Sequence, residues 1–145
     1  MDFQNEIVSQ EINRTGVRTI LVPTDFSEYS DMALQEAIGI AKHQDARIYL
    51  LHIRRLSEKI RVDSPDAMIR AQINKFSEAK SVDIVPDIRH GSPYKEILKE
   101  QAERKIELII ISSRARTGLF RHQPTKNLAA RIAKKSPCSI LVIGA

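Results

Sequence analysis

The chain has 145 residues, a formal net charge of +5 and 42% hydrophobic residues, a composition typical of one globular domain. No apolar run reaches membrane-spanning length, and residues 1–18 lack the apolar centre of a signal peptide, so we expect a cytoplasmic protein without a membrane partner. Cys138 is the only cysteine and lies beside an apolar strand, which favours a buried, reduced thiol over a disulfide or a reactive centre.

The positive charge is concentrated in the last quarter of the chain, where no acidic residue follows Glu107. Such a distribution suits either an anion site or an ordinary solvated surface with lysines near a helix C-terminus. Nucleic acid is an unlikely partner, because the tail lacks interleaved aromatic residues and any known reader motif. The basic residues of the tail are Arg114, Arg116, Arg121, Lys126, Arg131, Lys134 and Lys135.

The first predicted element is an apolar run at 19–22 without alternation, typical of a strand buried on both faces of a parallel sheet. The chain then turns polar at Thr24, Asp25 and Ser27. These side chains are therefore expected at the carboxyl end of the strand, the edge at which open α/β sheets bind ligands.

Ser27 is expected to cap a helix that ends near residues 42–43, with acidic residues in its first turn. A second buried strand follows at 47–53, and a charged loop at 54–62. His52 lies inside this strand, and a lone histidine there is more often a packed residue with one satisfied nitrogen than a base or a metal ligand.

Ser64 and Pro65 predict the start of the next helix. The alternating strand at 82–89 contains Pro86, so we expect it at an edge of the sheet. The third helix is expected to begin after Gly91, with Ser92 as its cap. The inward residues expected of these two helices are Met68, Ile69, Ile73, Phe76 and Ala79, and then Ile97, Leu98 and Ala102.

The last part of the chain predicts an internal strand at 108–111 and a polar loop at 112–123. A helix opening at Pro124 or Thr125 and a final strand at 137–143 follow. The inward residues expected of this helix are Leu128, Ala129, Ile132 and Ala133.

Five strands alternate with four helices, which predicts an α/β fold with a single doubly wound, five-stranded parallel sheet of order 3-2-1-4-5 and helices on both faces. This domain spans 18–145, and the polar residues 1–17 are expected to form a flexible N-terminal arm. Asp25 and Ser112 would flank the switch point, where the strand order reverses.

Several segments, in order and at consistent spacing, carry a family resemblance. They are Val22-Pro23-Thr24-Asp25-Phe26-Ser27, Gly91-Ser92-Pro93, Leu108-Ile109-Ile110, Arg116-Thr117-Gly118-Leu119, and residues 133–142 with Pro137-Cys138. Together they resemble the universal stress protein family over about residues 18–143. The resemblance implies a small cytoplasmic stress-response protein, usually a homodimer joined through its last strand. An apolar edge strand at Ser139–Ile143 would otherwise be exposed, which supports the same assembly.

One branch of this family binds ATP at the switch point, and the resemblance implies that Asp25 and Ile53 would hold adenine and ribose. In that branch the phosphates are held by a loop written G-x-x-G, nine residues, then G-[S/T]. Placed on this sequence, the three glycines fall at Ser112, Ala115 and Thr125, and the last position falls at Lys126.

None of the three glycines is present. Glycine allows backbone amides to approach phosphate closely and supports positive φ, which costs other residues about 1 kcal/mol or more. Weak or no ATP binding is therefore expected, and the protein is expected to carry no cofactor. The alternative is that it binds ATP together with Mg²⁺. Ser112 and Ser113 are small and hydroxylated, and the side chains of Arg114, Arg116 and Lys126 offer another way to hold an anion. The candidate, or vestigial, nucleotide site comprises Pro23, Thr24, Asp25, Ile53, Ser112, Ser113, Arg114, Arg116, Thr125 and Lys126.

Each polar residue after the first strand also has a purely structural interpretation, since Thr24, Asp25 and Ser27 can all serve the helix start. No catalytic grouping or metal-binding cluster is visible, and a receiver domain would need more acidic residues beside Asp25. The first hypothesis is thus a non-enzymatic stress protein that acts as a homodimer on an unidentified protein partner. The alternative is a module that senses ATP, AMP or a phosphorylated metabolite in an altered mode.

Overall fold

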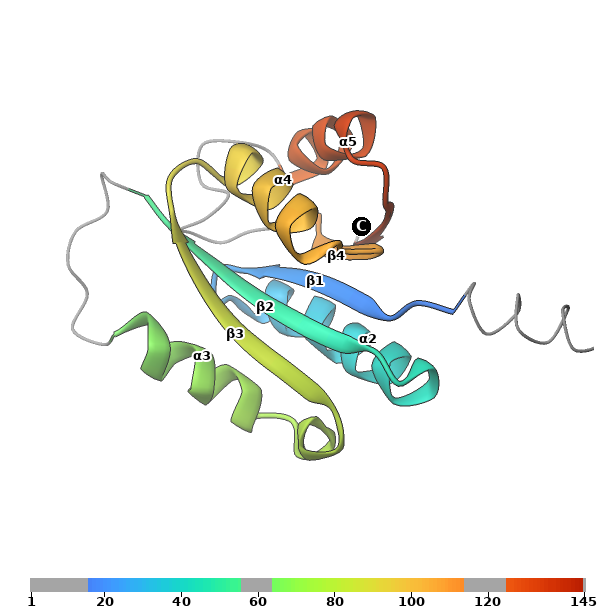
Figure 1. Ribbon diagram of the computed structural model, residues 1–145. Coiled ribbons are helices and arrows are strands. Elements are labelled where there is room, and N and C mark those ends of the chain that lie inside the picture. The colour runs from blue at the N-terminus through green and yellow to red at the C-terminus, as the bar shows by residue number, and fades with distance from the viewer. Residues whose placement is uncertain (1–15, 56–63, 114–124, 145) are drawn as a thin grey trace, which may run out of the picture.

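The computed structural model describes residues 16–55, 64–113 and 125–144, without the side chains of 125–127. One parallel sheet of five strands forms the centre of this part of the chain (Figure 1). The strands are β1 (Thr19–Thr24), β2 (Arg47–Arg54), β3 (Asp83–His90), β4 (Leu108–Ser112) and β5 (Ser139–Ile143). Their order is β3-β2-β1-β4-β5, which confirms the predicted topology.

Two pairs of helices enclose the sheet (Figure 1). The helices are α2 (Glu28–Gln44), α3 (Pro65–Asn74), α4 (Pro93–Arg104) and α5 (Thr125–Lys135), with a short 3-10 helix at Ser77–Ser81. Alternate side chains of β1 and β2 enter two separate apolar clusters, with Ile20 in one and Leu21 in the other. The first cluster packs against α2 and α3, and the second against α4 and α5.

Helix α3 is shorter than the predicted apolar stripe, because it ends at Asn74. Phe76 then adopts an extended backbone conformation, and Ala79 lies in the 3-10 helix instead. Both side chains still pack against the first apolar cluster. The prediction of inward residues was right here, but the prediction of one continuous helix was wrong.

Two alanines predicted to face inward, Ala102 and Ala133, are exposed. In α4 the inward positions next to Ile97 are taken by Glu100 and Gln101. Alanine is small enough to lie on either face of a helix, so Ala102 is a poor marker of the inward face of α4. Glu100 and Gln101 occupy that face instead. The capping prediction was partly right, since Ser92 is the N-cap of α4 but its side chain makes no capping hydrogen bond.

The switch point lies between β1 and β4. These strands pair at Ile20–Leu108 and Leu21–Ile109, and no later pair joins them although both strands continue to Thr24 and Ser112. Asp25 and Ser112 therefore lie at the carboxyl ends of adjacent strands, as the sequence predicts. The predicted N-terminal arm lies almost entirely outside the described residues; Val17, just before β1, packs against the first apolar cluster.

Candidate functional site

Asp25 forms the sharp turn between β1 and α2, and its carboxylate is almost fully buried. Its Oδ1 accepts hydrogen bonds from the backbone N–H of Ser27, at 3.0 Å, and from the Ser27 hydroxyl. Ser27 is the helix cap and accepts a hydrogen bond from the N–H of Ser30. Asp25 thus orients the capping residue, whereas the sequence suggested that it could cap the helix itself.

The second carboxylate oxygen of Asp25, Oδ2, is buried and has no hydrogen-bond partner among the described residues. A buried polar atom of this kind loses its hydration without compensation, at a cost of about 1–3 kcal/mol or more for a charged group. An N–H or O–H group of a ligand could donate the missing hydrogen bond to this oxygen. This unpaired oxygen is the one feature of the described site that itself indicates a ligand.

Thr24 is fully buried and holds the backbone on the other side of Asp25. Its hydroxyl accepts a hydrogen bond from the N–H of Phe26, at 3.0 Å, and Phe26 has a φ of 66°. Its carbonyl oxygen accepts from Nδ1 of buried His52, also at 3.0 Å. The Phe26 ring lies against the His52 ring, with centroids 4.4 Å apart. The interpretation of His52 as a packed residue with a satisfied nitrogen is confirmed.

The strand residues of the candidate set are built into the sheet. Pro23 lies in β1 opposite Leu51. Ile53 is fully buried in the second apolar cluster, and Ser112 is buried at the end of β4. The structure brings Asp25 and Ser112 to one edge of the sheet but offers the side chain of Ile53 to the core.

Ser113 has both of its donors engaged with the end of β5. Its backbone N–H donates to the carbonyl oxygen of Ile143 at 2.9 Å, and its hydroxyl donates to the carbonyl oxygen of Gly144. These bonds extend the β4–β5 pairing beyond Ser112. The predicted place of Ser113 in the candidate site, as a hydrogen-bond donor to a bound anion, therefore competes with its role in the sheet. Arg114 and Arg116 lie outside the described residues, as do the side chains of Thr125 and Lys126.

Sequence reasoning missed Gln72 of α3, which is buried and contacts the β1–α2 turn. Its Oε1 accepts a hydrogen bond from the Thr24 hydroxyl at 2.8 Å. Its Nε2 donates to Asp31 at 2.9 Å and to the Ser30 hydroxyl at 3.3 Å. The signal was a polar residue next to Ile73 and three positions after Ile69, on the inward stripe of a helix.

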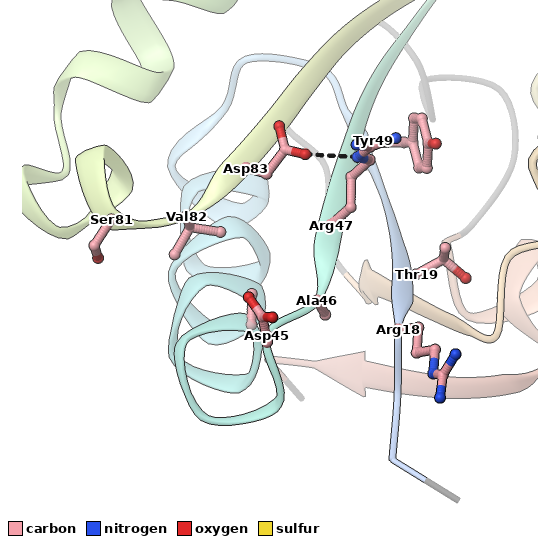
Figure 2. Close-up of a pocket in the computed structure, with 10 residues that line it drawn as sticks. Arg18, Thr19, Asp45, Ala46, Arg47, Tyr49, Ser81, Val82 and Asp83 are labelled. Carbon is pink, nitrogen blue, oxygen red and sulfur yellow. Dashed lines mark hydrogen bonds and ion pairs between the residues drawn. The ribbon is translucent and has the colours of Figure 1, made fainter. Parts of the chain in front are cut away.

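A cavity of about 320 Å³ lies at the opposite, amino-terminal edge of the sheet (Figure 2). It is lined by the first residues of β1, β2 and β3, and by the segment that follows α2. Arg47 and Asp83 face one another there as an ion pair of 2.6 Å. The charges of Arg47 and Asp83 neutralise each other, and the cavity lies at the other end of the strands from Asp25 and Ser112.

Within the described ranges, no helix combines the length and apolar character needed to cross a membrane. In the same part of the chain, no group of three or more His, Cys, Asp or Glu side chains is placed to hold a metal ion.

The fold defines an α/β protein of the doubly wound type, with Asp25 and Ser112 at the switch point of its sheet. The family model of the universal stress protein family matches residues 16–144, and the chain belongs to this family. It is 28% identical over 141 residues to universal stress protein MJ0531 of Methanocaldococcus jannaschii, covering 87% of this chain and 81% of the relative.

Solved structures agree on the fold. The hypothetical protein MJ0577 superposes with a TM-score of 0.71 at 22% identity, over 89% of this chain and 96% of that chain. A universal stress protein in complex with cAMP gives a TM-score of 0.65 at 20% identity, over 89% and 98% of the two chains. At these identities the likeness establishes the architecture and not the ligand.

Proposed function

We propose that this chain is a non-enzymatic stress-response protein of the cytoplasm that binds ATP weakly or not at all. The observation that carries the proposal is the engagement of Ser113. The first backbone amide after β4 donates to Ile143, so it is not available to a phosphate group. Phosphate sites of this kind depend on free amides, and this chain has no glycine at 112, 115 or 125 to bring other amides close.

Calorimetry with Mg-ATP tests this proposal, and we expect no binding in the micromolar range. The matched variant carries Ala115→Gly and Thr125→Gly, which removes two Cβ groups from the phosphate loop. It should bind Mg-ATP at least about tenfold more tightly than the natural chain, since glycine at both positions lets backbone amides approach the phosphate groups closely. Micromolar binding of Mg-ATP by the natural chain would overturn the proposal.

A second candidate function is the sensing of a nucleoside or nucleoside monophosphate, and it is favoured by Asp25 Oδ2. A base amine or a sugar hydroxyl would supply the missing donor, and this requires no phosphate loop. A relative of the same fold has been solved with cAMP, a nucleotide with one phosphate. The proposed ligand would reach Oδ2 only when the atoms that shield this oxygen move aside.

Titration with AMP and with adenosine, followed by chemical shifts of the Asp25 turn, distinguishes the two candidates. If the protein senses such a ligand, both AMP and adenosine should change the chemical shifts of Phe26 and Ser27. Mg-ATP should then bind no more tightly than AMP. Mass spectrometry of the purified, denatured protein adds a second readout. A protein that carries no nucleotide and shows no shift with AMP would leave only the first candidate.

The proposal includes a homodimer formed through β5, which acts on a protein partner. The strand is at the edge of the sheet, and its Val142 is 46% exposed. Unpaired apolar edge strands associate readily, so an exposed strand of this kind is usually covered. Nucleic acid is not part of the proposal, because the basic tail lacks interleaved aromatic residues and any known reader motif.

A further inference from the structure

The β1–α2 turn and helix α3 are joined by a buried chain of hydrogen bonds that passes through one side chain, Gln72. Helix α3 buries few other side chains: Ile69 and Gln72 are its buried residues. The three hydrogen bonds that the Gln72 amide makes with described residues all go to the segment from Thr24 to Asp31. Docking of α3 therefore depends in part on the segment that carries Asp25.

The chain of bonds reaches Asp25 from both sides. On one side the Phe26 N–H donates to the Thr24 hydroxyl, which donates to Gln72 Oε1. On the other side Gln72 Nε2 donates to the Ser30 hydroxyl, which donates to the carbonyl oxygen of Ser27. Ser27 in turn donates twice to Oδ1 of Asp25.

Donors and acceptors are matched along this path. The Thr24 hydroxyl accepts from the Phe26 N–H, and its single proton faces Gln72 Oε1 at 2.8 Å and the Ser30 hydroxyl at 3.0 Å. The Ser30 hydroxyl accepts from Gln72 and donates to the Ser27 carbonyl oxygen, and both N–H groups of the Gln72 amide are used. Buried networks in which every member is satisfied are rigid, and loss of one member leaves several groups unpaired. The geometry therefore favours joint ordering of α3 and the turn over independent motion.

We propose that Gln72 is a positioning residue that couples the docking of α3 to the geometry of the Asp25 turn. A ligand that binds Asp25 then stabilises docked α3, and docked α3 stabilises the ligand-binding turn, since such coupling is reciprocal. This inference rests on the candidate nucleoside site for its ligand, but the coupling between helix and turn stands without any ligand.

The coupling is tested by amide hydrogen exchange of the full chain without ligand. Gln72→Met keeps the side-chain volume and removes the amide. It should raise exchange of the Phe26 and Ser27 N–H groups by about tenfold, the effect of losing about one net hydrogen bond. Amides of β4 should change only as far as global unfolding changes.

Lys75→Ala is the matched control on the same helix. It removes the 2.8 Å ion pair between Lys75 and Asp31 but leaves the Gln72 amide in place. Exchange of Phe26 and Ser27 should stay within about twofold of the natural chain, because an exposed ion pair contributes little. Equal effects of the two variants, or no effect of Gln72→Met at the turn, would overturn the proposal.

Exchange of the natural chain in low urea gives a test that does not depend on a variant that folds. Amides of α3 and of the turn should open with the same free energy and the same urea dependence. Separate openings would contradict the coupling.

In a final arm, AMP should slow exchange in α3 of the natural chain and not in Gln72→Met. If AMP does not bind the natural chain, the nucleoside candidate fails, and the ligand-free exchange still decides the role of Gln72.

Discussion

At the scale of single residues, the two carboxylate oxygens of Asp25 differ, because one has a structural role and the other has no hydrogen-bond partner among the described residues. Its Oδ1 fixes Ser27, the cap of α2, whereas its Oδ2 is buried without a partner in the described chain. Groups held at a cost in stability are typical of functional sites, where the cost is recovered on binding. The two oxygens should therefore respond differently to substitution.

Asp25→Asn separates the two tasks. The amide keeps an oxygen for Ser27 and removes the buried charge, so we expect a melting temperature equal to or above that of the natural chain. Affinity for AMP should fall by about tenfold, because a carboxylate acceptor is lost. Thermal melts and an AMP titration on the same samples check both expectations. A marked loss of stability with unchanged AMP affinity would contradict them.

Two glycines make an informative pair at the same scale. Gly91 begins the turn into α4 with a φ of 144°, and an added Cβ would lie 2.9 Å from an oxygen of Glu96. Gly39 lies inside α2, and an added Cβ would meet nothing within 4 Å. The sequence places Gly91 before a helix start and Gly39 within a helix, and the structure adds what a Cβ would meet at each position.

Gly91→Ala should destabilise the fold by about 1–2 kcal/mol or more, because of the positive φ and the contact with Glu96. Gly39→Ala should stabilise it by about 0.5–1 kcal/mol through helix propensity. Urea unfolding of both variants measures the two effects. A change of the same sign in the free energy of unfolding of both variants would contradict this explanation.

At the scale of elements, β3 and α4 are joined by a cluster of charges. Arg89 of β3 contacts Glu96, Glu100 and Glu103 of α4. Arg104 lies 3.2 Å from Asp87 and 3.9 Å from Glu100. Glu100 is fully buried within this cluster. Burial and its hydrogen bond with Asp87 raise the pKa of Glu100 to about 7.

The paired carboxyl group, Asp87, shifts in the opposite direction. Burial would raise the pKa of Asp87, but hydrogen bonds with Glu100 and Arg104 lower it overall. The raised pKa of Glu100 and the lowered pKa of Asp87 favour protonation of Glu100 over Asp87. Neighbouring carboxyl groups commonly divide a proton in this way, because two adjacent negative charges repel.

This arrangement predicts a pH dependence of stability. The folded pKa of Glu100 is above its unfolded value of 4.5, so its contribution is fully present below pH 4.5 and is lost as pH rises through about 7. Urea unfolding at pH 5 and pH 8 should show a loss of about 1–3 kcal/mol from this group.

Glu100→Gln should abolish that part of the pH dependence, since the amide reproduces the protonated acid. Glu103→Gln is the control, because Glu103 contacts the same Arg89 from an exposed position. Identical pH profiles for the natural chain and Glu100→Gln would show that the proton is not held there.

At the scale of the whole molecule, the two edges of the sheet differ. The edge strand β3 contains Pro86 and charged residues, which discourage pairing with another strand. The other edge, β5, has only apolar residues after Ser139. Met32 and Val142 are the exposed large hydrophobic residues of the described chain, and Met32 lies near Gly144, just beyond β5.

We therefore predict a homodimer in solution, measured by light scattering at micromolar concentration. Val142→Lys should convert it to a monomer with an unchanged circular dichroism spectrum, because a buried, unpaired charge is costly. Ala102→Lys, on the exposed face of α4, should leave the dimer intact. A monomeric natural chain would refute the proposed assembly.

The sequence by itself determined the order and type of the elements, because the pattern of apolar residues is set by each strand and helix locally. It also placed Asp25 and Ser112 at one edge, since parallel strands present their carboxyl ends together. Caps at Ser27 and Ser64 were equally local, and both were correct.

Only the tertiary structure decided which polar groups are satisfied and by which partners. Gln72 contacts Thr24 across 48 residues, and Ser113 contacts Gly144 across 31. The local pattern shows that Gln72 lies on an inward stripe, but it identifies neither partner, since the pairings depend on how α3 packs and on how far β5 extends. The unpaired oxygen of Asp25 and the raised pKa of Glu100 have the same origin, because burial and hydrogen bonding are properties of the assembled chain.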